Sequence, residues 1–170
     1  LSTRLRMQLA IALARESVRQ KTGGPFGAVI VDEQDGRLVS VGVNLVTTAG
    51  LSIAHAEMVA LSLAQTAMGQ WNLSLAGALQ LVTSCEPCAM CFGALPWSGI
   101  KSLVCGARKA DAQAAGFDEG DKPARWIKSL QQRGIDVQCG VLQKQAAAVL
   151  AYYHDIGGPI YNATRGHDET

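Results

Sequence analysis

Two short segments of the chain carry side chains that can hold a metal ion. Cys88 and Cys91 are separated by two residues, so on the first turn of a helix their sulfurs lie on one face and can grip one ion. Pro87, just before them, suits a helix start because its fixed φ is helical and its missing N–H would be unpaired there. We expect His55 to supply the third ligand. A Cys-Cys-His set leaves one tetrahedral position open for water, which is typical of a catalytic zinc site.

Glu57 lies two positions after the expected ligand His55. A carboxylate next to a metal ligand, without being a ligand itself, can take the proton of a metal-activated water and hand it on. The order His-x-Glu followed by Pro-Cys-x-x-Cys is the signature of zinc-dependent nucleobase deaminases. The pattern therefore predicts a hydrolytic zinc site with Glu57 as its proton carrier.

Other uses of the cysteines fit this sequence less well. A zinc ribbon needs a second Cys-x-x-Cys, and a thioredoxin-like redox pair does not need the upstream His-x-Glu. Cys85, Cys88 and Cys91 also resemble the opening of a ferredoxin cluster run, but the position of the fourth cysteine is Leu95. A zinc-binding module without catalysis stays open as an alternative, although it leaves Glu57 unexplained.

The composition is that of a folded, soluble protein. The 170 residues, of which 48% are hydrophobic and 17% charged, suit a single domain that spans 1–170 and can bury a pocket. A formal net charge of +1 argues against a large nucleic-acid footprint, because such surfaces are usually basic. No apolar run approaches the ~20 residues of a membrane span. Five cysteines, an odd number, favour a reducing, cytoplasmic location over a disulfide framework.

Hydrophobic periodicity predicts an α/β fold that positions these segments. Two apolar runs around Asp35-Gly36 are typical of a hairpin, and later strands alternate with helices, as in a sheet with parallel strands. Both metal-binding segments should then sit at helix N-termini. The helix after His55 is apolar almost all round and is expected in the middle of the protein. We expect strands at 26–31, 38–43, 78–83, 102–105 and 135–139, helices at 1–20, 54–69, after Cys88, 124–133 and 143–153, and irregular segments at 111–121 and 157–170.

Four motifs together resemble the cytidine deaminase-like superfamily, and within it most closely the bacterial guanine deaminases. They are Gly24-Pro25-Phe26-Gly27 with the apolar run that follows, the His55 motif, the Cys88 motif with Trp97 after it, and Gly116-Phe117-Asp118-Glu119. The resemblance spans nearly the whole chain. It implies a three-layer α/β/α sandwich around a five-stranded mixed sheet.

The resemblance also implies roles for particular residues. His55, Cys88 and Cys91 match the zinc ligands and Glu57 the proton shuttle. Glu119 matches an acidic position that acts as a second shuttle in guanine deaminases, with Asp118 as the neighbour that could be confused with it. The residues placed at the substrate are Phe26, Asn44, Ala56, Trp97 and Tyr161.

Each substrate-side assignment has an ordinary structural alternative. Phe26 and Trp97 would be core residues in many proteins, and Asn44 at a strand end is ordinarily a turn former. The segment with Glu119 would be a surface loop, and 157–170 a frayed tail rather than a lid. Only the zinc set and Glu57 stand without the resemblance.

The implied activity is hydrolytic deamination of a purine base, most closely guanine to xanthine and ammonia. Deamination of an ammeline-like triazine, of cytosine or of adenosine in tRNA remains an alternative. The tRNA alternative predicts a basic RNA-binding surface, against which the near-zero net charge counts. The resemblance further implies a homodimer in which the C-terminal segments close the sites and are often exchanged.

Overall fold

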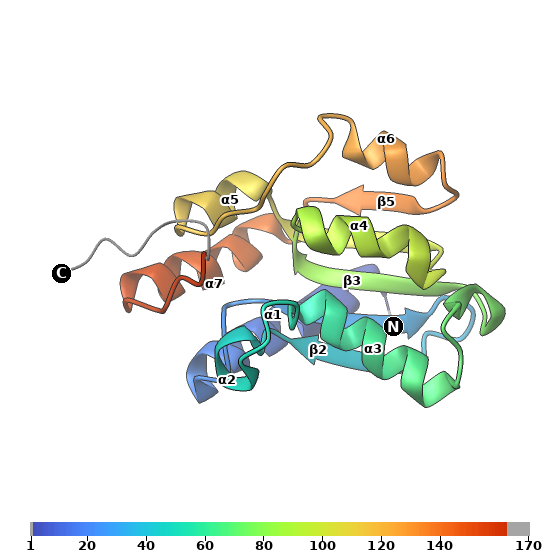
Figure 1. Cartoon of the computed structure of the whole chain (residues 1–170), viewed down its shortest axis with the longest axis horizontal. Helices are drawn as coiled ribbons and strands as arrows, with labels where there is room; N and C mark the ends of the chain where they lie inside the picture. The colour runs from blue at the N-terminus through green and yellow to red at the C-terminus, as the bar shows by residue number, and fades with distance from the viewer. Residues whose placement is uncertain (1, 163–170) are drawn as a thin grey trace.

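A five-stranded mixed sheet forms the centre of the computed structural model, which describes residues 2–162 (Figure 1). Its strand order is β2-β1-β3-β4-β5. Strand β1 runs antiparallel to both of its neighbours, whereas β3, β4 and β5 are parallel. The strands are β1 (Gly27–Asp32), β2 (Leu38–Val43), β3 (Leu79–Cys85), β4 (Ser102–Ala107) and β5 (Asp136–Cys139).

The predicted hairpin is present as β1 and β2. Gly27 pairs with Val43, and the tight connection contains Gly36 at φ 73°, a left-handed conformation that glycine adopts without steric cost. Every residue of β1 is buried, because helices cover both faces of the sheet there. The hairpin thus ends next to Asn44, close to where the chain turns toward His55.

Helices cover the sheet in two layers, so the predicted three-layer α/β/α sandwich is confirmed (Figure 1). Side chains alternate along the central strands: Val29 faces a core built with α1 and α7, while Ala28 and Ile30 face a second core built with α3, α4 and α6. The helices are α1 (Thr3–Gln20), α2 (Val46–Ala49), α3 (Ala56–Met68), α4 (Ala89–Ser98), α5 (Lys109–Ala114), α6 (Trp126–Gln131) and α7 (Gln143–Asp155), with a short 3-10 turn η1 (Leu73–Leu75). Among the described residues, no helix is long and apolar enough to cross a membrane.

Two short helices are not among those that the sequence predicts. Helix α2 is a single turn after Asn44, too short for hydrophobic periodicity to reveal it. Helix α5 begins at Arg108, whose backbone N–H donates to the side chain of Asp111 at 2.7 Å. A capping contact of this kind fixes a helix start that has no apolar pattern of its own.

The expectation that α3 is buried in the middle of the protein is wrong. It lies in an outer layer and packs on the sheet through Ala56, Ala60 and Ala64, while Leu63 is 51% exposed. The approach to β2 is close, because a Cβ on Gly42 would collide with the backbone of Ala56 and Ala60. Small residues one turn apart therefore form the contact with the sheet, and larger apolar residues are left on the outer face.

Candidate active site

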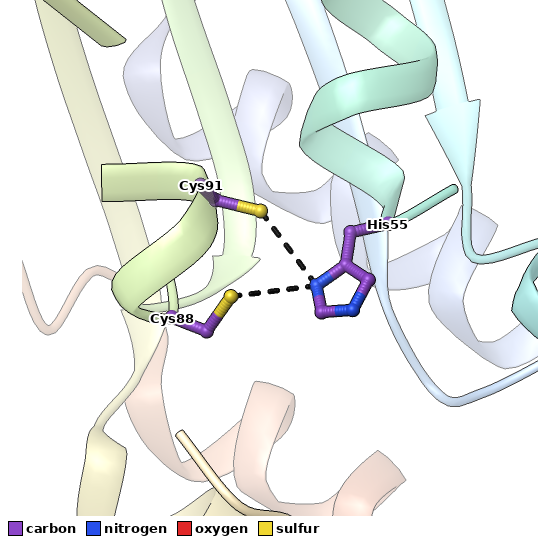
Figure 2. Close-up of side chains that lie close together, drawn as sticks. All are labelled: His55, Cys88 and Cys91. Carbon is purple, nitrogen blue, oxygen red and sulfur yellow. Dashed lines mark hydrogen bonds between the residues drawn. The ribbon is translucent and has the colours of Figure 1, made fainter. Parts of the chain in front are cut away.

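The side chains of His55, Cys88 and Cys91 converge between two helix N-termini (Figure 2). His55 is the N-cap residue of α3, and Cys88 is the N-cap residue of α4, with Cys91 on the first turn. The Nδ1 atom of His55 is 3.4 Å from Sγ of Cys88 and 3.7 Å from Sγ of Cys91. Tetrahedral zinc, with bonds of about 2.3 Å to sulfur and 2.0 Å to nitrogen, separates these atoms by about 3.5 Å. The three side chains therefore fit one zinc ion.

The thiols of Cys88 and Cys91 differ in pKa, and this difference favours metal binding. A hydrogen bond from Cys91 lowers the pKa of the Cys88 thiol to about 4, helped by a second bond to His55 and opposed by burial. The same contact and burial raise the pKa of Cys91. The lowered pKa of Cys88 favours the thiolate form that binds metal, and helix N-termini also favour negative charge at this place.

Cys85 does not join this cluster. It is buried at the end of β3, and its sulfur lies 3.9 Å from the carbonyl oxygen of Arg108. Among residues 2–162, the group of His, Cys, Asp and Glu side chains close enough to share an ion consists of His55, Cys88 and Cys91. This geometry agrees with rejecting an iron–sulfur cluster.

A cavity of about 160 Å³ opens beside the metal-binding group. It is smaller than the roughly 300–1,000 Å³ of typical sites for drug-sized ligands, so it suits a single heterocycle. One part of its wall is aromatic and another acidic. The lining residues are Phe26, Phe117 and Tyr161, with His55, Glu57, Glu86, Cys88, Asp118, Glu119 and Asn162.

Glu57 reaches the cavity from the first turn of α3, just after His55. It is 6% exposed. Burial raises the pKa of its carboxyl group, and the neighbouring negative charge at Cys88 raises it further. A raised pKa makes the carboxylate a stronger base, which suits a group that must take up a proton and pass it on.

Glu119 is a second buried carboxyl group in the same cavity, and it comes from the loop after α5. It is 5% exposed, and its Oε2 has no hydrogen-bond partner among the described residues. Burial raises the pKa of Glu119 to about 8, with further contributions from the charges at Cys88 and Glu57. An unpaired buried carboxyl group is costly, so its presence favours a functional role.

Asp118 differs from its neighbour Glu119 in burial, although both line the cavity. It is exposed at the cavity rim, where its Oδ1 accepts a hydrogen bond from the Gly120 N–H at 2.9 Å. Its own backbone N–H donates to Oδ1 of Asn162 at 3.0 Å. The geometry thus favours Glu119 over Asp118 as the second proton carrier.

Asn44 is completely buried, and its side-chain amide is held in one orientation. Its Oδ1 accepts hydrogen bonds from the N–H groups of Gly24 and Val46, each at 3.2 Å. Its Nδ2 has no partner among the described residues, and neither does the hydroxyl of Tyr161, which lies against Gly24. Fixing the oxygen leaves N–H donors free for a ligand, so Asn44 remains a candidate for base recognition.

The described part of the C-terminal segment lies over the cavity rather than away from it. The hydroxyl of Tyr153 donates to the carbonyl oxygen of Pro159 at 2.8 Å, and Nδ2 of Asn162 donates to that of Gly116 at 2.8 Å. Tyr161 packs between these contacts, with its ring 5.3 Å from Phe117 and 6.3 Å from His55. The remainder of the predicted lid, 163–170, lies outside the described residues.

Two predicted substrate contacts are placed differently. Trp97 is 81% exposed and lines a surface depression with Met58 and Leu61, apart from the residues that line the cavity, so its contact with substrate stays a prediction. Trp97 follows Cys91 by six residues, which is about 9 Å along a helix, so its indole lies away from the metal-binding end of α4. Ala56 packs its side chain in the core, which leaves only its backbone to meet a substrate.

Sequence reasoning missed two residues near this site. Glu86 lines the cavity and is 8% exposed, and Lys122 holds the turn before Cys88 through the carbonyl oxygen of Pro87. Glu86 stands inside the Thr-Ser-Cys-Glu-Pro-Cys stretch, so its position could have been noticed. Nothing in the sequence around Lys122 distinguishes it from a surface lysine.

Comparison with known proteins agrees with this geometry. Residues 2–107 match the family described as cytidine and deoxycytidylate deaminase zinc-binding region. The chain therefore belongs to this family of zinc-binding deaminases, and zinc is the metal that its three ligands fit.

Within the family, guanine deaminases are among the most similar proteins, as the motifs predicted. Guanine deaminase of Bacillus subtilis is 43% identical over 124 residues, which are 69% of this chain and 76% of that protein. A solved structure of guanine deaminase from Nitrosomonas europaea has a TM-score of 0.88 at 44% identity, covering 91% of this chain and 85% of that chain. NE0047 in complex with 2,6-diaminopurine has a TM-score of 0.89 at 46% identity, covering 95% and 86%.

A tRNA-modifying enzyme is also similar to this chain. The tRNA-specific adenosine deaminase of Bacillus subtilis is 34% identical over 154 residues, which are 88% of this chain and 86% of that protein.

The metal assignment predicts opposite outcomes for two neighbouring cysteines, Cys85 and Cys88. Cys88→Ala should abolish stoichiometric zinc, because two remaining ligands cannot complete the site. Cys85→Ala should keep about one zinc per chain, since its sulfur is not in the cluster. Metal content of the purified variants measures both. Zinc retained by Cys88→Ala, or lost from Cys85→Ala, would contradict the assignment.

Proposed function

We propose that this protein catalyses the hydrolytic deamination of guanine to xanthine and ammonia. The observation that carries the proposal is a second buried carboxyl group, Glu119, in the cavity that already holds Glu57 and the metal-binding residues. Related guanine deaminases support the choice of base. The cavity volume of about 160 Å³ supports a free base as the substrate.

Glu57 is proposed to carry the first proton. Zinc held by His55, Cys88 and Cys91 supplies Lewis acidity, which lowers the pKa of the attacking water. Two thiolate ligands donate strongly to the metal and weaken this effect, so a base is still needed. Glu57 accepts the proton of the water and delivers it to the ring nitrogen beside the carbon that is attacked.

Glu119 is proposed to protonate the leaving amine. In guanine the amino group is on C2, between two ring nitrogens, so a carboxyl group that serves one nitrogen must move far to serve the amine as well. A second carboxyl group from a different element removes that need. Glu119 gives its proton to the amine, and the C2–N bond breaks as ammonia leaves. The proton of the new C2 hydroxyl then passes to the Glu119 carboxylate as the C2=O bond of xanthine forms. Its raised pKa, about 8, means that Glu119 carries a proton at neutral pH and can donate it.

The remaining substrate contacts are proposed for recognition. Asn44 offers N–H donors whose direction is fixed by the two hydrogen bonds to its oxygen. Phe26 and Tyr161 supply aromatic surface in the cavity, and the backbone of Ala56 lies in the first turn of α3. Flat aromatic walls favour a planar heterocycle and exclude water from the reacting carbon.

Other deamination substrates are the alternatives. Ammeline-like triazines and cytosine present a similar amino-bearing carbon, and the sequence similarity to a tRNA adenosine deaminase keeps that activity in view. The formal net charge of +1 and the cover over the cavity by Tyr161 and Asn162 count against a polynucleotide.

A substrate panel tests the proposed function. The zinc-loaded protein should release ammonia fastest from guanine when guanine, cytosine, ammeline, guanosine and an adenosine-34 tRNA are compared. Glu57→Gln should keep its zinc and lose at least ~10²–10⁴-fold in rate, because an amide cannot accept the proton. Faster release from another substrate, or a Glu57→Gln rate within tenfold of the parent, would refute the proposal.

The two acidic neighbours in the loop should differ sharply in kinetics. Glu119→Gln should cut guanine deamination by orders of magnitude at full zinc content, because the amide cannot donate the proton. Asp118→Asn is the matched control and should stay close to the parent. Near-parental rates for both variants would show that neither carboxyl group takes part in the reaction and that the loop is only structural.

We also propose a single-domain, cytoplasmic protein that forms a homodimer. Its five cysteines are free, which suits a reducing compartment. The outer face of α3 and α4 exposes Leu63 and Trp97, at 51% and 81%, which suits a contact with a second copy. Sedimentation equilibrium should give the dimer mass, and Trp97→Glu should shift it toward the monomer. A parent that sediments as a monomer would contradict this.

A further inference from the structure

We propose that Lys122 is a positioning residue for the reaction: it fixes the loop that carries Glu119 against the turn that carries Cys88. The inference rests on the proposed function of Glu119 as a proton carrier. It concerns a residue for which the sequence offers no motif.

Lys122 is buried in a way that is unusual for lysine, with a side-chain exposure of 3%. Its Nζ donates a hydrogen bond to the carbonyl oxygen of Pro87 at 2.6 Å and lies 3.8 Å from Oε2 of Glu86. The ammonium also lies 4.6 Å from the ring centroid of Trp126. Burying a cation is costly unless such partners compensate, so these contacts hold the side chain in one place.

The partners of Lys122 connect the two halves of the site. Pro87 immediately precedes the metal ligand Cys88, and Lys122 follows Glu119 by three residues. A displacement of Lys122 would therefore change the distance between the Glu119 carboxyl group and the metal-binding turn.

Other contacts show that this loop packs tightly on the start of α4. The backbone N–H of Ala89 donates to the carbonyl oxygen of Glu119 at 2.9 Å, and Nζ of Lys109 donates to that of Gly120 at 3.1 Å. A Cβ added to Gly120 would come within 2.9 Å of the Ala89 side chain. The loop is thus held at consecutive residues, and Lys122 is the contact that reaches the turn before Cys88.

Glu86 supplies the charge that makes this burial tolerable. Its carboxylate lies 3.0 Å from Nη1 of Arg108 and accepts from the backbone N–H of Lys109 at 3.3 Å. Arg108 and Lys109 begin α5, the helix that leads into the Glu119 loop. Glu86 therefore joins the start of α5 and, through Lys122, the loop after this helix to the end of β3.

Precise placement matters because a shift of about 1 Å in a reacting group can cost ~10²-fold in rate. A merely structural lysine would affect folding and zinc content without acting through Glu119. The two roles differ in one measurable way. Loss of a positioning residue should matter little once the carboxyl group that it positions is absent.

The test is a double-mutant cycle between Lys122→Met and Glu119→Gln in the zinc-loaded protein. Lys122→Met keeps the length of the side chain and removes its charge and its donor. It should lower kcat for guanine by about tenfold or more, with KM and zinc content near the parent. In the Glu119→Gln background the same change should cost less than about twofold. Lys128→Met, at an exposed lysine of α6, is the matched control and should be neutral.

A second readout does not depend on activity. The amide hydrogen of Ala89, which is bonded to Glu119, should exchange at least about tenfold faster in Lys122→Met, and at the parental rate in Lys128→Met. If Lys122→Met fails to fold, Lys122→Gln, which keeps a donor without the charge, replaces it in both experiments.

The outcomes separate the inference from the proposed function. An equal loss in both Glu119 backgrounds, or unchanged exchange at Ala89, would overturn the positioning role of Lys122. A Glu119→Gln variant as active as the parent would refute the proposed role of Glu119. In that case faster exchange at Ala89 would still show that Lys122 fixes the loop, and unchanged exchange would reject that as well.

Discussion

The site depends on one convergence: two helices begin at the same place, and each presents metal ligands from its first residues. His55 caps α3 and Cys88 caps α4, so the positive ends of both helices meet around the sulfur atoms. The sheet makes this meeting possible, because β3 leads directly into the Cys88 turn while the β1–β2 hairpin leads the chain toward His55. Small residues on α3 then bring it close to the sheet. The other residues of the cavity lie around this meeting point of the two helices.

Two buried carboxyl groups give the cavity its chemistry and also destabilise it. Burial raises the pKa of both Glu57 and Glu119, so the protonated form of each carboxyl group is favoured over the charged form. A protein keeps such groups only where the surrounding structure over-determines their placement. Here the Glu119 loop is held by hydrogen bonds with Ala89, Lys109 and Asn162, and by the buried ammonium of Lys122. These stabilising contacts therefore surround the loop that carries the destabilising buried carboxyl group of Glu119.

Much of this arrangement could be predicted from spacing, and the rest depends on orientation. Cys88 and Cys91 are three positions apart, and residues at this spacing lie on one face of a helix, so the sequence predicted that both bind one ion. The upstream His55 and Glu57 completed the motif. The exposure of Trp97 near the end of α4, and of large apolar residues on the outer face of α3, depends on tertiary packing, which composition alone does not show. The partners of Lys122 are distant in sequence, so tertiary contacts alone identify it.

X-ray absorption at the zinc edge of the purified protein measures the ligand set of the metal. Two sulfur ligands and one imidazole nitrogen are expected, with a further light atom from solvent at the open position. The Cys85→Ala variant should give the same spectrum, because that sulfur lies outside the cluster. A third sulfur, or four protein ligands with no place for solvent, would contradict the account and favour a structural zinc module.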